Sequence, residues 1–101
     1  MAKDLSVGAL IDIYGAFLSD KQREIMSHYY NDDLSLSEIA ENEGTTRQAV
    51  SDIIRRGEAQ LKKYESKCGY LAKILAIKSI CEVDISNEDK VKRISDVIED
   101  F

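Results

Sequence analysis

The sequence predicts an all-α protein built around a helix-turn-helix. Its 101 residues include no proline and only five glycines, and this scarcity of turn residues favours long helices joined by short loops. Apolar residues make up 44% of the chain and charged residues 33%, a balance typical of folded globular domains. Three helix-start signals also follow one another between Ser19 and Gln48.

Two helices are expected before residue 31. Ser6 or Asp4 is a candidate cap for the first helix, and Ser19 with Gln22 has the spacing of a capping box for the second. Apolar residues three and four apart give each helix one buried face. For the first helix these are Val7, Leu10, Ile11, Tyr14, Phe17 and Leu18, and for the second they are Ile25, Met26, Tyr29 and Tyr30.

The most informative segment runs from about Ser35 to Arg56. Ser35-Leu-Ser-Glu38 is a second capping box, and Thr45-Thr-Arg-Gln48 is a third. Gly44 stands between them, at a position suited to the left-handed conformation that ends a helix. Two short helices separated by a tight glycine turn are therefore expected.

Two helix starts separated by a glycine turn at Gly44 have the spacing of a helix-turn-helix. The motif needs a small residue where the helices meet, a glycine in the turn, and apolar residues that lock the second helix. Ala40 and Gly44 meet the first two needs, although Glu43 and Thr45 stand where apolar residues are more usual. The locking residues are expected to be Ile39, Val50 and Ile53.

Further helices are expected after the motif. A heptad-like apolar seam continues to Gly69, which is the expected break; it comprises Ile54, Gly57, Leu61, Tyr64, Cys68 and Leu71. Residues 70–83 are expected to form an apolar helix, and Ser86-Asn-Glu-Asp89 is expected to cap a last one. We therefore divide the chain into a helix-turn-helix domain with its N-terminal helix, 1–69, and a C-terminal helical extension, 70–101, packed on the core or at a dimer interface.

The net charge of −5 is unevenly distributed. Residues 1–44 carry nine acidic and three basic side chains, whereas residues 45–67 carry six basic and three acidic ones. Because salt screens charges over about 8 Å, a local basic stripe can act on an acidic molecule. A +3 stripe implies a salt slope of about −3 per chain, which alone gives weak binding. Useful affinity would need a dimer or a partner.

The start of the helix after Gly44 is the expected nucleic-acid interface. With Val50 and Ile53 turned inward, the outward residues near its start are Arg47, Gln48 and Ser51, the expected base contacts. The expected phosphate contacts are Thr46, Arg55, Arg56, Lys62 and Lys63. The alternative is that this face is only solvated and the motif docks a protein.

Little in the sequence points to enzyme chemistry. Cys68 and Cys81 are expected to be reduced thiols packed as small apolar residues, and His28 to be structural. Asp32-Asp33 reads as a polar loop because no further carboxylates complete a cage. We expect no catalytic residues, no cofactor and no metal. Without an apolar run of about 18 residues or a signal-peptide pattern, a cytoplasmic location is expected.

From Leu18 to Tyr64 the chain resembles region four of bacterial sigma factors. The likeness is carried by Leu18-Ser-Asp-Lys-Gln-Arg-Glu24, Leu34-Ser-Leu-Ser-Glu-Ile-Ala-Glu41 and Gly44-Thr-Thr-Arg-Gln-Ala-Val50. From about Leu10 to Gly69 the chain resembles still more closely the YlxM family of small sigma-like helix-turn-helix proteins. The stretches specific to that likeness are Tyr14-Gly15 with Leu18 to Arg23, the pair Tyr29-Tyr30, Asp33 to Ala40, and Arg47 to Val50.

The resemblance implies a sigma region-four-like bundle and a regulatory role in the signal recognition particle pathway. DNA, the particle's RNA or the particle's GTPase are the partners that it suggests. Two alternatives stay open: a protein-interaction module that binds the GTPase through the acidic first 44 residues without nucleic acid, and a DNA-binding transcription regulator unrelated to secretion. A homodimer is also expected, because the apolar faces exceed what one small core obviously absorbs.

Overall fold

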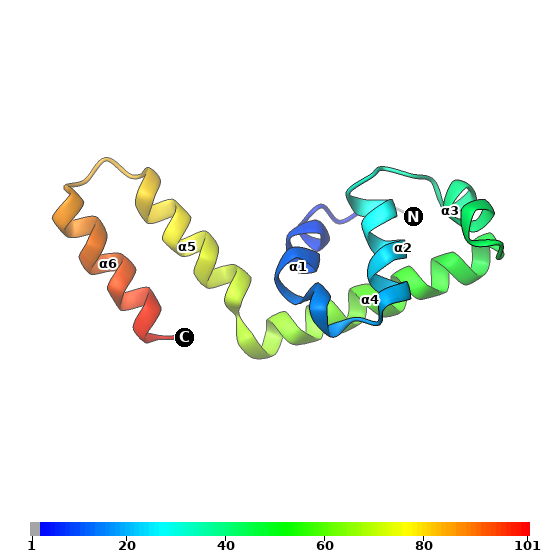
Figure 1. Ribbon diagram of the computed structural model, residues 1–101. Coiled ribbons are helices and arrows are strands. Elements are labelled where there is room, and N and C mark those ends of the chain that lie inside the picture. Colours follow the sequence, from blue (N-terminus) through cyan, green and yellow to red (C-terminus); the bar gives the residue numbers. More distant parts are fainter. Residues whose placement is uncertain (1–2) are drawn as a thin grey trace. The chain divides into compact units, whose positions relative to one another are not determined.

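The computed structural model describes residues 3–101, which form an all-α protein, as the sequence predicts (Figure 1). Contacts divide the chain into two compact units: an N-terminal unit that extends to Tyr64 and a C-terminal unit, Glu65–Phe101. None of the helices within residues 3–101 is long and apolar enough to cross a membrane. In chain order the elements are α1 (Ser6–Tyr14), the short 3-10 helix η1 (Gly15–Phe17), α2 (Asp20–Tyr30), α3 (Leu36–Glu43), α4 (Arg47–Cys68), α5 (Tyr70–Glu82) and α6 (Asn87–Glu99).

The hydrophobic core of the described chain belongs entirely to the N-terminal unit. Each of its four α-helices contributes at least one side chain that solvent does not reach, such as Val7, Met26, Ile39 and Ile54. The core is close to the expected set, because the apolar positions recur with the helical period. Its buried members are Val7, Leu10, Ile11, Tyr14, Leu18, Ile25, Met26, Tyr29, Ile39, Ala40, Val50, Ile54 and Leu61.

The first helix is shorter than predicted. α1 ends at Tyr14, and the chain then tightens into η1, so Phe17 turns outward and is 67% exposed while Leu18 stays buried. The prediction that Phe17 and Leu18 share the buried face of one continuous helix was therefore wrong for Phe17. Its ring instead lies edge-on to Tyr64, with the ring centroids 5.8 Å apart.

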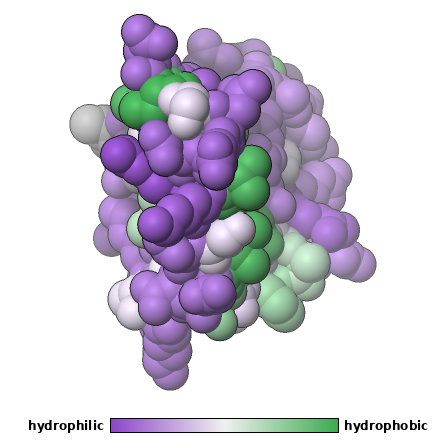
Figure 2. Space-filling model, turned by 90° about the vertical axis from the view of Figure 1, so that its left-hand side faces the viewer, coloured by the Kyte–Doolittle hydropathy of each residue, from purple (hydrophilic) through white to green (hydrophobic). Residues whose placement is uncertain are grey.

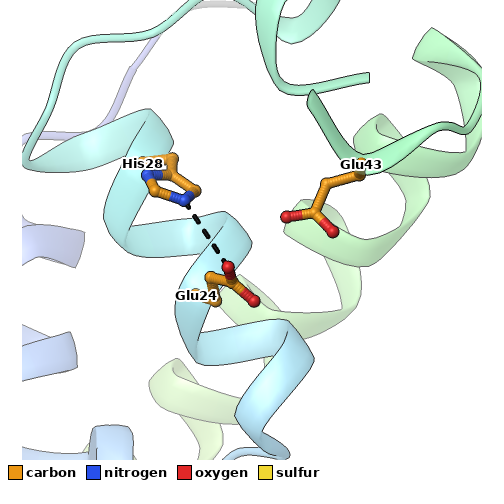
Figure 3. A group of neighbouring side chains, drawn as sticks. All are labelled: Glu24, His28 and Glu43. Carbon is orange, nitrogen blue, oxygen red and sulfur yellow. Dashed lines mark ion pairs between the residues drawn. The ribbon is translucent and has the colours of Figure 1, made fainter. Parts of the chain in front are cut away.

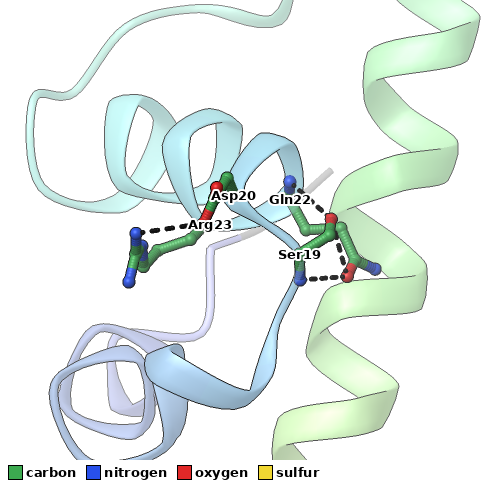
Figure 4. A network of polar contacts seen from close by, with 4 residues as sticks. All are labelled: Ser19, Asp20, Gln22 and Arg23. Atoms are coloured by element: carbon green, nitrogen blue, oxygen red, sulfur yellow. Dashed lines mark hydrogen bonds and ion pairs between the residues drawn. The ribbon is translucent and has the colours of Figure 1, made fainter.

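The capping box at the start of α2 is confirmed (Figure 4). The Ser19 hydroxyl accepts a hydrogen bond from the Gln22 amide at 3.1 Å, and the Gln22 side chain accepts one from the Ser19 amide at 3.2 Å. Arg23 forms an exposed ion pair with Asp20 at 3.4 Å. The reciprocal bonds satisfy two of the amides that a helix start leaves free, and they fix where α2 begins.

Gly57 brings α4 unusually close to α2. A Cβ atom at this position would lie only 2.0 Å from the Met26 sulfur, which is far inside van der Waals contact. Gly57 and Met26 are both buried. The glycine in the predicted seam therefore serves close helix packing.

The C-terminal unit consists of the end of α4 and the antiparallel pair α5 and α6 (Figure 1). Gly69 separates α4 from α5 with a φ of 66°, and the Ser86 hydroxyl caps α6 by accepting from the Asp89 amide, both as predicted. No residue of α5 or α6 is buried. Cys68 and Cys81 are free and exposed, so the prediction that they pack as buried apolar residues was wrong.

Candidate nucleic-acid interface

The turn between α3 and α4 has the predicted geometry. Ser35 and Glu38 form a reciprocal capping box at the start of α3. Gly44 ends the helix with a φ of 66°, and the amides of Gly44 and Thr45 donate to the carbonyls of Glu41 and Ala40 at 3.3 and 3.0 Å. This pair of bonds is a Schellman motif, and it turns the chain sharply into α4.

α4 begins one residue later than the third capping box predicts. The hydroxyl of Thr46, rather than that of Thr45, accepts from the Ala49 amide at 3.1 Å. A reciprocal box is ruled out because Ala49, three residues after the cap, has no polar side chain. Thr46 and the first helical residues, Arg47 and Gln48, are exposed.

The inner face of α4 is rotated slightly from the prediction. Val50 is fully buried as expected, but Ile53 is only half-buried and Ile54 takes the central place, with no exposed surface. Gly57 and Leu61 continue this face. The rotation leaves Ser51 and Asp52 half-buried at the border of the exposed face.

The three predicted base-contacting residues lie together. Arg47, Gln48 and Ser51 line one open groove of about 470 Å³, and Leu36 from the start of α3 lines it as well. Leu36 was not among the residues predicted from the sequence. Its position directly after the Ser35 cap was the available signal, because the first residue of α3 faces the start of α4 across the turn. The groove therefore combines polar groups with an apolar wall.

Asp52 organises the polar side chains next to this groove. Its carboxylate accepts from the Gln48 amide group at 3.2 Å and from the Arg55 guanidinium through a very short contact. The bond from Arg55, followed by the one from Gln48, lowers the pKa of Asp52 below its usual value. Asp52 is therefore firmly anionic, and it restrains one predicted base contact and one predicted phosphate contact at once.

The predicted phosphate contacts are only partly brought together. Arg55 and Arg56 share a second open hollow of about 350 Å³ with Asp52 and Ala59. Lys62 instead places its ammonium group 3.4 Å from Asp4, whose pKa is lowered by bonds from Ser6 and then by Lys62. Neither Lys62 nor Lys63 lines either hollow.

A cluster of Glu24, His28 and Glu43 lies where α2 meets the end of α3 (Figure 3). One ligand atom of each lies within 4.8 Å of the others, so the three side chains are a possible metal-binding group. However, Lys21 already pairs with Glu43 at 2.5 Å, and Asp32 holds His28 Nδ1 at 2.9 Å. The cluster is thus explained as an ion-pair network that braces α3 against α2.

The same network explains the unusual residue Glu43. The helix-turn-helix pattern favours an apolar residue there, yet the Glu43 side chain is only 11% exposed. Lys21 compensates its charge by hydrogen bonding and Coulomb attraction, which raise the pKa of Lys21. A charged side chain is tolerated at this half-buried place because its partner comes from the neighbouring helix.

A compact all-α unit in which a glycine turn joins a short helix to a helix with an exposed polar start defines a helix-turn-helix protein. The chain belongs to the UPF0122 family, described as "Putative helix-turn-helix protein, YlxM / p13 like", whose model matches residues 1–101. The family resemblance seen in the sequence is thereby confirmed.

Similar proteins carry the same family name. A UPF0122 protein of Clostridium botulinum is 48% identical over 73 residues, which cover 72% of this chain and 67% of the relative. One from Shouchella clausii is 49% identical over 78 residues, covering 77% and 72%. One from Clostridium kluyveri is 51% identical over 67 residues, covering 66% and 60%. The alignments thus leave part of each relative unmatched.

Proposed function

We propose that this protein is a regulatory protein that binds nucleic acid through the start of α4. The observation that carries the proposal is the groove in which Arg47, Gln48 and Ser51 meet. In helix-turn-helix proteins the N-terminal residues of the second helix reach base edges in the major groove. Arginine suits guanine, glutamine suits adenine, and serine accepts or donates to either.

The states of the individual side chains support different roles. Arg47 forms no hydrogen bond or ion pair with any other residue in the range 3–101, so it is available to a ligand. Gln48 is already oriented by Asp52, which leaves its carbonyl oxygen able to accept from a base. Both residues are held on a helix whose start is fixed by the Thr46 cap, and this preorganisation lowers the entropy cost of binding.

Phosphate contacts are proposed beside the groove. Arg55 and Arg56 lie about two turns after Arg47 along α4, and they share the hollow with Asp52. Arg55 must break its hydrogen bond to Asp52 before it can bind a phosphate. Asp52 therefore weakens binding to the phosphate backbone of the nucleic acid, which does not depend on the base sequence. Thr46, Lys62 and Lys63 complete the proposed set, with Lys62 having to leave Asp4.

The cellular role that we propose rests on the family resemblance rather than on the groove. It is a cytoplasmic role in the signal recognition particle pathway, with the particle's RNA or DNA as the nucleic acid and the particle's GTPase as a further partner. We also propose that the protein acts as a homodimer, because a second +3 stripe doubles the phosphates neutralised. We propose that residues 1–69 bind the nucleic acid and that residues 70–101 support assembly of the homodimer.

A salt titration of binding to duplex DNA and to the particle's RNA tests the proposal. Arg47→Ala is expected to weaken specific binding about 5- to 150-fold, the loss typical of an arginine that reads a base. Arg55→Ala is expected to weaken binding to all sequences and to reduce the salt slope by about 1 per chain. Arg93→Ala, an exposed arginine on α6, is the matched control and should leave binding unchanged.

The same titration separates the alternatives. Loss on Arg47→Ala that is confined to DNA supports a transcription regulator, and binding that is confined to RNA supports a role on the particle. If the wild-type protein shows no salt-dependent binding to either, the nucleic-acid proposal fails. Binding to the purified GTPase alone would then favour the protein-interaction module with its acidic N-terminal 44 residues.

A further inference from the structure

The C-terminal unit leaves much of its apolar surface uncovered. Neither α5 nor α6 has a buried residue, although α5 is apolar around most of its circumference. A helix of that kind normally lies inside a protein. The large exposed side chains, with their exposed fractions, are Tyr70 (41%), Ile74 (45%), Leu75 (52%), Val83 (42%), Val91 (64%), Ile98 (56%) and Phe101 (56%).

Nothing else inside this unit replaces a core. It comprises the 37 residues Glu65–Phe101, and chains of fewer than about 40 residues usually need a disulfide, a metal or association to be stable. Cys68 and Cys81 are free. The possible metal-binding group found in residues 3–101 lies in the other unit. Association is the remaining means of stabilisation.

Five of the exposed apolar residues share one side of the helix pair. Helical periodicity places Tyr70 and Ile74 on the same side of α5, and Val91 and Ile98 on the corresponding side of antiparallel α6. The stacked rings of Tyr70 and Phe101, 5.7 Å apart, join the two helices at one end. Figure 2 shows a hydrophobic band beside the hydrophilic surface of this part of the chain. We name this surface, formed by Tyr70, Ile74, Val91, Ile98 and Phe101, the hairpin face.

We propose that the hairpin face binds the hairpin face of a second copy, so that two α5–α6 pairs form a four-helix bundle. This inference deepens the proposed homodimer by naming its interface. The five large side chains of the hairpin face, each about half exposed, offer on the order of 500 Å² of apolar surface per chain. Two copies would bury about 1,000 Å², which is the smallest area expected of a specific interface.

A second copy also suits the charges around the hairpin face. Helical periodicity places both signs at its border, with Lys78 and Glu82 on α5 and Glu88 and Lys92 on α6. A two-fold dimer brings the same surface of each copy together, and a border of mixed sign allows opposite charges to meet there. The border of the hairpin face has no excess of one sign of charge that would attract a strongly basic or a strongly acidic partner.

The test measures the mass of the full chain in solution without nucleic acid, so its result is independent of the proposed binding function. Light scattering at micromolar concentrations is expected to give twice the chain mass of 11.4 kDa. Ile98→Glu and Ile74→Glu should each weaken the dimer at least 100-fold. Phe17→Glu, which places the same charge on an exposed apolar residue of the N-terminal unit, is the matched control and should stay dimeric.

Amide hydrogen exchange of the wild type covers the case in which a glutamate variant fails to fold. Exchange in α5 and α6 should slow as the protein concentration rises, while exchange in α1 to α4 should not change. A monomeric wild type, protection of α5 and α6 at every concentration, or a dimer that Phe17→Glu breaks and Ile98→Glu does not, would each overturn the proposal. Constant protection would show that the hairpin face is covered within one chain, and a monomer that binds the GTPase through it would identify that partner instead.

Discussion

The N-terminal and C-terminal units are both helical, and both contain helices that begin at serine caps, yet only the N-terminal unit has a buried core. Ile54 of α4 has no exposed surface, whereas Ile98 of α6 is 56% exposed. The same apolar periodicity predicts both α4 and α6. This periodicity indicates which residues share a face of a helix, but not whether another element covers that face. Whether that face is covered depends on how many other elements surround it. The contrast shows that local sequence can specify a helix while the stability of that helix depends on the elements that pack against it.

The sharpest test of this contrast truncates the same residue type in both units. Ile54→Ala removes buried methyl groups from the core, and we expect it to lower the free energy of unfolding by about 2 to 5 kcal/mol. Ile98→Ala, studied at concentrations at which the chain is monomeric, should change it by less than about 0.5 kcal/mol. Urea unfolding followed by circular dichroism measures both. Equal losses would contradict the difference between the units.

Gly57 tests the close approach of α4 and α2. We expect Gly57→Ala to cost about 1 to 3 kcal/mol, because its Cβ must displace the Met26 sulfur in a packed core. Gly8→Ala in α1 is the matched control, since the nearest atom to its Cβ is Asn31 Oδ1 at 3.8 Å. That change should be neutral or stabilising by up to about 1 kcal/mol. The midpoint of thermal unfolding should therefore fall for Gly57→Ala and stay the same or rise for Gly8→Ala.

Gly44 and Gly69 allow a comparison of the same backbone strain in the two units. Both have a φ of 66° and open space around them, so an alanine side chain meets strain but no clash. We expect each substitution to cost roughly 1 to 2 kcal/mol locally. For Gly44→Ala the loss should appear in the unfolding of the N-terminal unit. For Gly69→Ala the loss should appear only as faster amide exchange in α5. If Gly69→Ala also lowered the stability of the N-terminal unit, the chain would not consist of two separate units.

The smallest expected effects come from the helix caps. Ser35→Ala removes a reciprocal capping box from a helix that belongs to the core, and we expect it to cost about 1 kcal/mol of global stability. Ser86→Ala removes a cap from a helix without buried residues, so its loss should appear as fraying of α6. Exchange rates of the first-turn amides measure both. A global loss from Ser86→Ala would show that α6 is more tightly integrated than its exposure indicates.

Some errors of sequence reasoning have identifiable physical causes. The apolar periodicity extends to Phe17 and so did not indicate that α1 ends at Tyr14 and a 3-10 helix follows. A 3-10 turn keeps nearly the same spacing of apolar residues as an α-helix. The choice between Thr45 and Thr46 as the cap could not be made from residue types, since both have the same side chain. Ile53 and Ile54 are adjacent, so a small rotation of α4 decided which of them is buried.

Contacts between elements lay further beyond the reach of the sequence. Leu36 joins the groove only because the turn at Gly44 brings the start of α3 to the start of α4. Asp52 accepts hydrogen bonds from Gln48 and Arg55 at the same time, and this depends on the rotamers that the folded helix selects. Similarly, Lys21 reaches Glu43 only after α2 and α3 have packed.

The sequence by itself determined the serine caps of α2, α3 and α6, the glycine turns at Gly44 and Gly69, and the exposed position of Arg47 and Gln48. Each of these follows from bonds and spacings within one or two helical turns, whereas the cap position of α1 is Leu5, which forms no side-chain cap hydrogen bond, rather than the expected Asp4 or Ser6. Only the tertiary structure decided which isoleucine of α4 enters the core, which polar groups share the groove, and that α5 and α6 keep an uncovered apolar face. Those outcomes depend on packing between elements far apart in the chain, and local patterns carry no information about the partner that an apolar face meets.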